Sequence, residues 1–482
     1  MTPLLLGGEM PHWSDREPTG GAALGELVAA ASGHTLVVGP HDPALIEAVP
    51  ARHVTVLVRG VPDAEALAAR FASRPGFEVC CGSLEKLAAV PAYDTVIALD
   101  GLDRTGSAES PDISWAAGLS LLLAVLRPGG RLLLGVDNAV GLHRMLACAA
   151  EPGDAEWGSA FDPTRPTGPD RLRERLHEGG LPALRTYAAF PCPQSPSVLL
   201  DERLLDAPDL DGFVASALRR AGDGGKPLLA DPRPLAVQLL RHGLAAATAP
   251  GWIVVAGRGA ALPDGIVVSG AVTELTGGHL TNKGTGERLP VPAGRCLHDL
   301  LLAAVRGHDR VRLRALLTAW QGGETAPVDA DAVIVDFEGR LHAVASPASP
   351  GEALRRFAQA VHDEGLAHLW PSPADSSETA ALLGAIAGVE IGAGAARPPA
   401  RALRELTAAH DRLARELREA KDQARWYDDK LAERDAELAR AHRVISLLKG
   451  TVPGRAATAV RGALRTGKRA ARTALTRLNR NP

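Results

Sequence analysis

Aromatic side chains are scarce in this chain of 482 residues, at 4% of the total, so its core must be built from aliphatic side chains. The five cysteines show no metal-ligand spacing, and we expect reduced thiols and no metal site. The longest clean apolar run, Ala116–Leu126, is far shorter than the roughly 20 residues that a membrane-spanning helix needs. The N-terminus lacks a basic segment followed by an apolar one, so we expect no signal peptide and a cytoplasmic protein.

The charge of the chain is unevenly distributed. The formal net charge is −3, but residues 449–482 contain nine Lys or Arg and no acid, which leaves −12 for residues 1–448. A chain of this length is too long for one hydrophobic core, so two or three domains are expected. The basic C-terminal tail is therefore expected to act separately from the acidic remainder.

The stretch LSLLLAVLRPGGRLLLGVDNAVGL, residues 119–142, organises the first half of the chain. An apolar helical face ends at Arg127, and Pro128-Gly129-Gly130 predicts a turn. The run Leu132–Val136 is apolar at consecutive positions, which is typical of a strand buried on both faces of a parallel sheet. The strand ends at Asp137 and Asn138, and ligands of open α/β sheets bind at such strand ends.

Strands and helices alternate before this stretch. After a loose arm at residues 1–20, the sequence predicts strands at Thr35–Val38, Val54–Val58, Glu78–Cys81 and Thr95–Leu99, with helices at Ala22–Ala31, Ala44–Val49, Ala64–Ala72 and Leu84–Val90. Together with the strand at residues 132–136, this order predicts an α/β fold with a parallel, doubly wound sheet.

Four segments carry a resemblance to a known family: LVVGPHDP, CCGSLEKL, YDTVIALDGL and LRPGGRLLLGVDN. With them, the region from Ala22 to Arg258 resembles the class I S-adenosylmethionine-dependent methyltransferases. Residues 137–142, Asp-Asn-Ala-Val-Gly-Leu, are similar to the Glu-Asn-x-x-Gly-Leu that follows strand five in methyltransferase domains of bacterial cell-surface polysaccharide biosynthesis. The resemblance implies a Rossmann-like seven-stranded methyltransferase sheet, completed by Trp252–Gly257, and S-adenosylmethionine as cofactor.

The cofactor-binding positions of the family are only partly kept. The family's Gly-x-Gly-x-Gly turn, where glycine leaves room for the cofactor, here has Gly39, His41 and Pro43. Its ribose-binding acid corresponds to Arg59, which has no acceptor atom. The resemblance assigns cofactor contacts to Gly39, His41, Asp42, Arg59, Ser83, Leu84 and Asp100. Asp42 is also in the position of a helix N-cap, His41 in that of a solvated turn residue, and Asp100 in that of a strand-end cap.

Methyl transfer to a sugar hydroxyl requires a base, and Asp137 and His143 are the candidate catalytic residues, with Asn138 as a substrate-binding residue. His143 also fits a plain helix surface position. The signature Asn/Asp-Pro-Pro-aromatic, which marks methylation of nucleic acid bases in this superfamily, is replaced by Asp100-Gly101-Leu102-Asp103. Nucleic acid is therefore not an expected substrate.

The remaining chain predicts four further parts after a methyltransferase-like domain at residues 1–258 with a helical insert at 210–247. Residues 259–370 are expected to form a small α+β domain, and residues 371–400 a linker rich in Pro, Ala, Gly and Ser. The AVIVDFEGRLHAV hairpin in the former is similar to the metal-binding hairpin of kinase-like phosphotransferases, but Ala345 stands where the second ligand would follow. We read Asp336 as a turn residue.

A heptad pattern predicts a coiled coil at residues 401–449. Counted from Leu403, eleven of fourteen a and d positions between residues 403 and 448 are Leu, Ile or Ala, with no Pro or Gly in between. Such a rod would be roughly 70 Å long at 1.5 Å per residue. Leucine at this spacing has nothing to bury against in a lone helix, so we expect a homo-oligomer formed through residues 403–448. A single charged helix on the body is the alternative.

The basic tail, residues 450–482, places Val460, Leu464, Ala471, Leu475 and Leu478 near one helical face among Lys and Arg. Such a segment suits an anionic membrane surface, which we favour over nucleic acid phosphates or a solvated tail. The protein would then lie peripherally at the inner face of the membrane.

Two functions remain open. One is a methyltransferase that O-methylates a sugar or cell-envelope glycan precursor. The other is a catalytically inactive methyltransferase-fold scaffold that oligomerises and docks at the membrane beside glycan-assembly enzymes.

Overall fold

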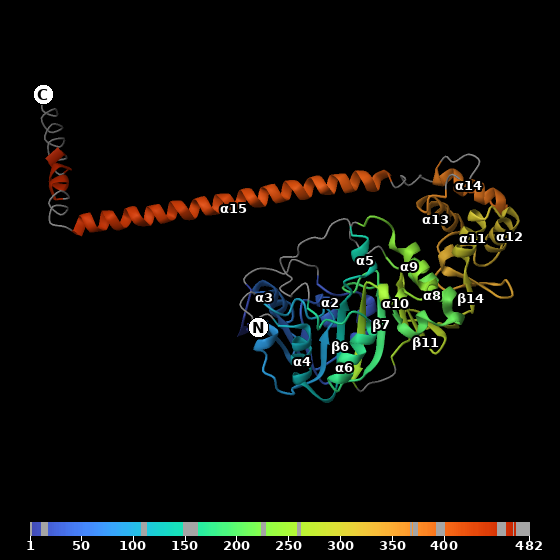
Figure 1. Ribbon diagram of the computed structural model, residues 1–482, viewed down its shortest axis with the longest axis horizontal. Helices are drawn as coiled ribbons and strands as arrows, with labels where there is room; N and C mark the ends of the chain where they lie inside the picture. The colour runs from blue at the N-terminus through green and yellow to red at the C-terminus, as the bar shows by residue number, and fades with distance from the viewer. Residues whose placement is uncertain are drawn as a thin grey trace, which may run out of the picture. The chain divides into compact units, whose positions relative to one another are not determined.

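The computed structural model describes residues 2–10, 18–107, 113–147, 162–222, 228–257, 262–366, 369, 375–391, 401–450, 459–465 and 467–468 (Figure 1). The chain forms two compact units, Met1–Pro399 and Ala400–Pro482. The first unit contains the sheet and the candidate site.

A mixed sheet of thirteen strands forms the centre of the first unit. The strands are β1 (Leu4–Gly7), β2 (His34–Val38), β3 (His53–Val58), β4 (Phe77–Gly82), β5 (Tyr93–Ala98), β6 (Leu126–Asp137), β7 (Ala183–Phe190), β8 (Val198–Asp201), β9 (Gly251–Gly257), β10 (Gly265–Ser269), β11 (Ala271–Thr276), β12 (His279–Asn282) and β13 (Arg288–Pro290). Their spatial order is β1-β4-β3-β2-β5-β6-β9-β7-β8-β10-β11-β12-β13. The α/β fold is as predicted, but the sheet is larger than seven strands.

Strands β1 to β6 are parallel, whereas β9 is antiparallel to β6 and β7 is antiparallel to β9. From β2 the chain first builds outward through β3 and β4, and then returns to add β5 and β6 on the other side of β2. The order of the strands therefore reverses between β2 and β5. In open α/β sheets this switch point leaves a crevice at the carboxyl ends of the strands, where ligands bind.

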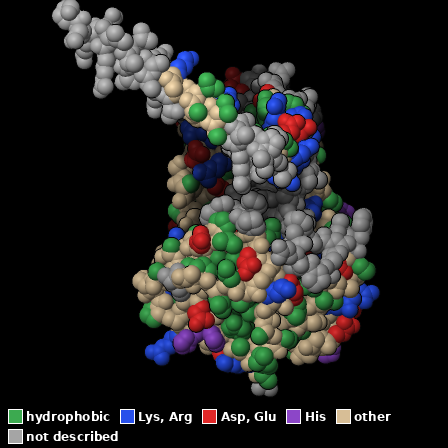
Figure 2. Space-filling view, turned by 90° about the vertical axis from the view of Figure 1, so that its left-hand side faces the viewer, with side chains coloured by type: hydrophobic (Ala, Val, Ile, Leu, Met, Phe, Trp, Pro, Cys, Tyr) green, Lys and Arg blue, Asp and Glu red, His purple; other side chains and the backbone are tan. Residues whose placement is uncertain are grey.

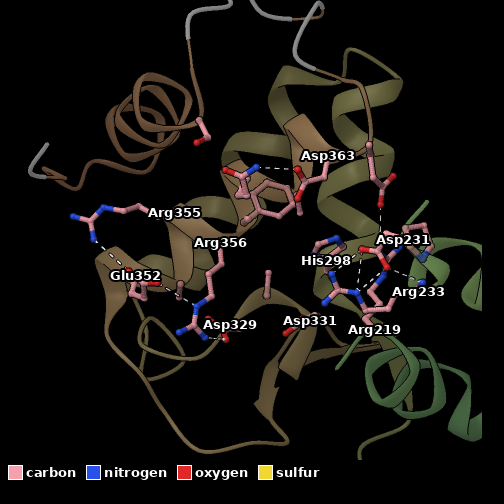
Figure 3. A pocket seen from close by; sticks show the side chains of 18 of the residues that line it. Arg219, Asp231, Arg233, His298, Asp329, Asp331, Glu352, Arg355, Arg356 and Asp363 are labelled. Carbon is pink, nitrogen blue, oxygen red and sulfur yellow. Dashed lines mark hydrogen bonds and ion pairs between the residues drawn. The ribbon is translucent and has the colours of Figure 1, made fainter. Parts of the chain in front are cut away.

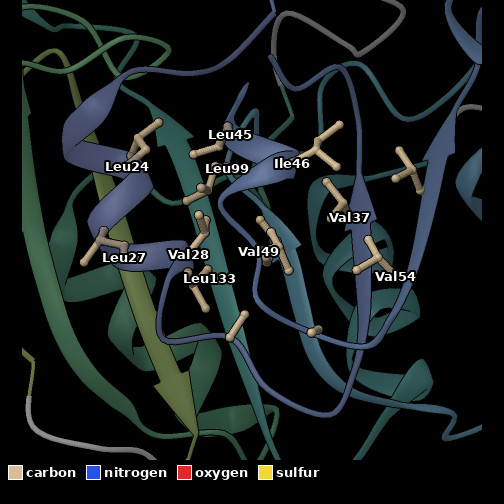
Figure 4. Close-up of a cluster of buried hydrophobic side chains, with 14 of the residues drawn as sticks. Leu24, Leu27, Val28, Val37, Leu45, Ile46, Val49, Val54, Leu99 and Leu133 are labelled. Atoms are coloured by element: carbon tan, nitrogen blue, oxygen red, sulfur yellow. The ribbon is translucent and has the colours of Figure 1, made fainter. Parts of the chain in front are cut away.

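Helices cover both faces of the parallel part. On one face α1 (Ala22–Val28), α2 (Pro43–Glu47) and α3 (Val61–Arg70) bury side chains such as Leu24, Leu27 and Ile46 against the strands (Figure 4). On the other face α4 (Trp115–Val125) and α6 (Pro169–Glu178) contribute Leu119, Leu122, Leu172 and Leu176. Each fully buried Leu or Ile stabilises the fold by about 1.5–3 kcal/mol relative to an exposed one. The predicted Leu84–Val90 helix is only a 3₁₀ turn at Leu84–Lys86.

The described part of the N-terminal arm, residues 2–10 and 18–20, is not loose as the sequence suggested. Leu4 and Leu5 pair with Cys80 and Cys81, so that β1 adds a parallel strand to the edge of β4, and Met10 forms a bridge with Gly60. The backbone groups of an open sheet edge need partners, and the arm supplies them. Pro and Gly residues in this segment hid the strand from a composition-based prediction.

The region after β9 extends the main sheet, because β10 pairs antiparallel with β8. The predicted insert contains α8 (Asp211–Arg220), α9 (Pro232–Arg241) and α10 (Ala245–Thr248), preceded by α7 (Glu202–Leu205) and a 3₁₀ turn at Pro208–Leu210. A second sheet follows, made of β14 (Gly294–Cys296), β15 (Val333–Asp336) and β16 (Leu341–Ala343) in that order. The domain boundary at residue 258 stays a prediction.

Helices α11 (Leu297–Arg306), α12 (Arg310–Gln321), α13 (Pro350–Asp363) and α14 (Ser376–Ala387) form a separate core beside the small sheet, together with the 3₁₀ turn Ala330–Ala332. Helix α14 lies inside the predicted linker, where Ala380 and Leu383 are fully buried in this core. The short apolar stretch at residues 380–389 is thus part of a packed helix.

The second unit contains one long helix, α15 (Arg401–Gly450), of 50 residues. Residues 459–465 and 467–468 of the tail are also helical, and the other positions of the predicted tail face lie outside the described residues. Within the described part of the chain, no helix combines the length and the hydrophobicity of a membrane span.

Candidate functional site

The switch point brings the predicted cofactor residues together at neighbouring strand ends. Gly39 and His41 follow β2, and Asp100 follows β5 across the crevice. Arg59 follows β3, and Ser83 follows β4. Gly39 has φ of +93°, a conformation that favours glycine, so this part of the family turn is kept.

His41 is turned into the protein rather than into solvent. It is 3% exposed; its Nδ1 lies 3.0 Å from the carbonyl oxygen of Gly39, and its Nε2 lies 3.2 Å from the backbone nitrogen of Leu99. Nε2 therefore accepts the Leu99 N–H while Nδ1 donates to Gly39. Burial lowers the pKa of His41, which fits a neutral ring in these bonds. The ring thus links the loop after β2 to the end of β5.

The carboxylate of Asp100 is fully used by groups of the chain. The Arg104 guanidinium donates to both of its oxygens, with Nε 2.7 Å from Oδ2, and the Thr19 hydroxyl donates to Oδ1 at 2.7 Å. The two side chains of the ion pair are 3% and 1% exposed. Bidentate, charge-assisted bonds of this kind fix both partners in place.

The residues around the turn after β2 are also held by the N-terminal arm. Thr19 forms a parallel bridge with His41: its N–H donates to Pro40, and the N–H of Asp42 donates to Thr19. The Asp42 side chain caps α2 by accepting the N–H of Ala44 at 2.7 Å. The N-cap alternative for Asp42 therefore describes its observed contact.

Arg59 and Ser83 are buried as well. Arg59 is 5% exposed, and its Nη1 donates to the carbonyl of Gly106 at 2.8 Å. Ser83 is fully buried and donates to Glu85 at 2.5 Å, next to the buried Leu84. S-adenosylmethionine needs acceptors for its ribose hydroxyls and room at the turn after β2. These residues do not fit it, because Arg59 is a donor, Asp100 is paired and His41 fills the turn.

The predicted catalytic pair lies one strand further along, at the end of β6. His143 Nε2 is 3.0 Å from Asp137 Oδ1, and Arg144 also binds this carboxylate. Burial would raise the pKa of Asp137, but His143 and Arg144 outweigh it and bring the pKa to about 2. An acid with such a pKa is a weak base at neutral pH. Nδ1 of His143 is buried and has no hydrogen-bond partner among the described residues.

Asn138 has a structural set of contacts. Its amide nitrogen donates to the carbonyls of Ala247 and Ala249, both at 2.8 Å, and its Oδ1 accepts the N–H of Val140 at 3.1 Å. Both amide hydrogens are therefore used to join the end of β6 to the chain before β9. The sequence placed Asn138 correctly at a strand end but could not show these partners.

Sequence reasoning missed Arg104 and Thr19, the two residues that bind Asp100. Arg104 stands four residues after Asp100, but this segment is not a helix, so the spacing did not predict the pair. Arg165 was also missed; it pairs with Asp103 and donates to the carbonyl of Asp137 at 3.2 Å. Residues far apart in the chain meet here, so spacing alone does not predict the contacts.

A cavity of about 550 Å³ lies between α8, α9, α13 and the 3₁₀ turn at residues 330–332 (Figure 3). The arginines that line it are each bound to a carboxylate: Arg219, Arg233, Arg355 and Arg356 pair with Asp299, Asp231, Glu352 and Asp329 respectively. The cations that an anionic ligand would need thus already have partners in the chain. Among the described residues, no group of three His, Cys, Asp or Glu is placed to hold a metal ion.

Comparisons with known proteins add the following. No protein-family model matches the sequence, and no curated protein matches it. A chain of the complex between the Haloferax volcanii Trm112 methyltransferase activator and a putative methyltransferase is similar in structure, with 14% identity, a TM-score of 0.30, and coverage of 49% of this chain and 88% of that one. The N-methyltransferase NodS from Bradyrhizobium japonicum WM9 has 14% identity, a TM-score of 0.25, and coverage of 34% and 81%.

A putative sarcosine dimethylglycine methyltransferase from Galdieria sulphuraria has 13% identity, a TM-score of 0.25, and coverage of 48% and 80%. NodS has also been solved with S-adenosyl-L-homocysteine. The evidence for the fold of this chain is its own strand order, with the switch point between β2 and β5 and antiparallel strands beyond β6. The chain has an α/β fold built on a large mixed sheet.

Proposed function

We propose that this protein is a catalytically inactive methyltransferase-fold scaffold that self-associates through α15 and docks at a membrane surface through its basic tail. The observation that supports it best is the Asp100–Arg104–Thr19 network, which occupies the switch point with the chain's own charges. A cofactor that contacts the Asp100 carboxylate would first have to displace these bonds. A scaffold needs only a stable body, and buried, fully bonded polar groups provide one.

Titration of the full-length protein with S-adenosylmethionine and S-adenosylhomocysteine in a calorimeter tests this proposal. We expect no saturable heat, with any dissociation constant weaker than about 1 mM, or roughly −4 kcal/mol. A cooperative thermal melt of the same sample serves as the control for folding. A micromolar binding curve that His41→Ala abolishes would contradict the proposal and locate the cofactor in the crevice.

The second candidate is S-adenosylmethionine-dependent O-methylation of a sugar or cell-envelope glycan precursor. The Asp137–His143 pair favours it, because it lies at the carboxyl end of β6 and His143 is 16% exposed. For this function His143 must turn one nitrogen toward the acceptor hydroxyl. Micromolar cofactor binding in the same titration would favour this candidate over the scaffold.

Docking of the tail at an anionic membrane is the second part of the proposal. The described tail residues Val460 and Leu464 are 58% and 66% exposed, and the tail has no acid to oppose its cations. Among the described residues on the face drawn in Figure 2, Lys or Arg and Asp or Glu side chains are interspersed, unlike a continuous basic surface for nucleic acid. Each cation near an anionic surface contributes about 1 kcal/mol.

Co-sedimentation with vesicles tests whether the tail binds an anionic membrane. We expect the full chain to pellet with vesicles that contain phosphatidylserine and to be released by high salt, because the attraction is screened. A chain that ends at residue 448 should stay in the supernatant, as should the full chain with vesicles of phosphatidylcholine alone. Equal sedimentation of the two chains would remove the membrane from the proposal.

A further inference from the structure

Helix α15 carries an apolar ridge that no described residue of its own unit covers. Leu413, Leu417, Leu431, Leu438 and Ile445 are between 46% and 64% exposed. They lie three, four or seven residues apart or at multiples of seven, so they share one face of the helix. Burying a Leu or Ile side chain is worth about 1.5–3 kcal/mol, and five exposed ones strongly favour a partner.

The charges beside the ridge fit a second copy of the same helix. In the heptad frame that starts at Leu403, Glu416, Lys430 and Glu437 occupy g positions, and Lys421, Asp435 and His442 occupy e positions. All six side chains are exposed. In a parallel pair, each g residue faces the e residue five positions later on the other helix.

This rule gives three complementary contacts in register: Glu416 with Lys421, Lys430 with Asp435, and Glu437 with His442. In an antiparallel pair, g residues face g residues of the other helix, and e residues face e residues. The antiparallel alignment that joins Lys421 to Asp435 also brings Glu416 opposite Glu437. The charge pattern therefore favours the parallel arrangement without shift.

One residue of the seam indicates the number of strands. Arg434 occupies a d position, is 79% exposed at its side chain, and has a Glu437 oxygen 4.0 Å away. In a two-stranded coil the long side chain at d can reach solvent at the edge of the seam. In a coil of three or four helices the d positions are more enclosed, and several arginines would be buried together without pairing.

We propose that α15 forms a parallel, in-register, two-stranded coiled coil with a second copy of this chain. This inference specifies the self-association part of the proposed function and rests on it, but it is independent of the cofactor question. The two basic tails then leave from the same end of the rod. Two linked tails bind a surface more tightly than one, because the second binds at a high effective concentration.

Disulfide trapping tests orientation and register in the full chain, with Cys148 and Cys192 replaced by serine. We expect Leu417→Cys and Ile445→Cys each to give a covalent dimer under mild oxidation. In an antiparallel pair a residue meets its own copy only at the centre, so at most one of the two would react. The matched control is Ala436→Cys at an outward f position, which should stay monomeric on a denaturing gel.

Light scattering measures the number of strands. We expect twice the chain mass of 50.2 kDa for the native protein and a twofold drop for Leu431→Asp, with no change for Ala432→Asp at the neighbouring b position. A monomeric or trimeric mass of the native protein, or trapping at only one of the two cysteine positions, would overturn the proposal. Cofactor binding in the calorimeter would not affect these results, so the two failures can be told apart.

Discussion

Replacing Arg104 with alanine is expected to lower the free energy of unfolding by about 3–5 kcal/mol, because it leaves the buried carboxylate of Asp100 without its counter-charge. Both side chains of this pair are at most 3% exposed, and Arg104 supplies donors to both carboxylate oxygens. Thr19 would remain as a single neutral donor to Asp100. The change is measured as a shift of the urea unfolding midpoint, with circular dichroism as the probe.

A second Arg–Asp pair in the same unit serves as the matched control. Arg127 and Asp94 lie 2.8 Å apart but are 46% and 40% exposed, so Arg127→Ala should cost about 0–1 kcal/mol. Replacing Arg104 by methionine and Asp100 by leucine together should recover most of the lost stability, since no buried charge is left unpaired. If Arg104→Ala and Arg127→Ala had equal effects, the Asp100 network would not be the anchor of the crevice.

The sequence predicted five of the six parallel strands, β2 to β6, because each contains a short apolar stretch bounded by Gly, Pro or acidic residues, but it missed β1. The run Leu132–Val136 is an example: it forms the buried end of β6 between β5 and β9. The added strands were harder to recognise. β10 to β13 are antiparallel strands with polar and exposed positions, and only the pairing of β10 with β8 joins this group to the main sheet.

For the candidate site too, the sequence predicted positions but not contacts. The strand-end positions of His41, Asp100 and Asp137 followed from where each apolar run stops. Their partners did not follow, because Thr19 and Arg165 reach them from segments 81 and 28 residues away, as the contacts of Asp100 and Asp137 show. A residue type and a strand end predict a place in the fold. Whether the side chain is free for a ligand depends on tertiary contacts.

Replacing Gly135 with alanine is expected to lower the free energy of unfolding by at least about 3 kcal/mol. This is the upper end of the usual range for overpacked positions. A Cβ at Gly135 would lie 1.9 Å from the carbonyl oxygen of Leu99 and 2.7 Å from its carbonyl carbon. Both clashes are with backbone, which no rotamer change relieves. The clash can be relieved only if β5 and β6 move apart. That movement would also shift the Leu99 N–H, which donates to His41.

The matched control for this substitution is Gly25→Ala in α1, where a Cβ would meet nothing within 4 Å. Alanine is favoured over glycine inside a helix by roughly 0.5–1 kcal/mol, so this variant should equal or exceed the native protein in its urea midpoint. Gly135→Ala should instead shift the midpoint down, or yield no folded protein while Gly25→Ala from the same preparation is soluble. A native midpoint for Gly135→Ala would mean that β5 and β6 do not approach each other closely at Leu99, and the position of Asp100 over the crevice would lose its structural basis.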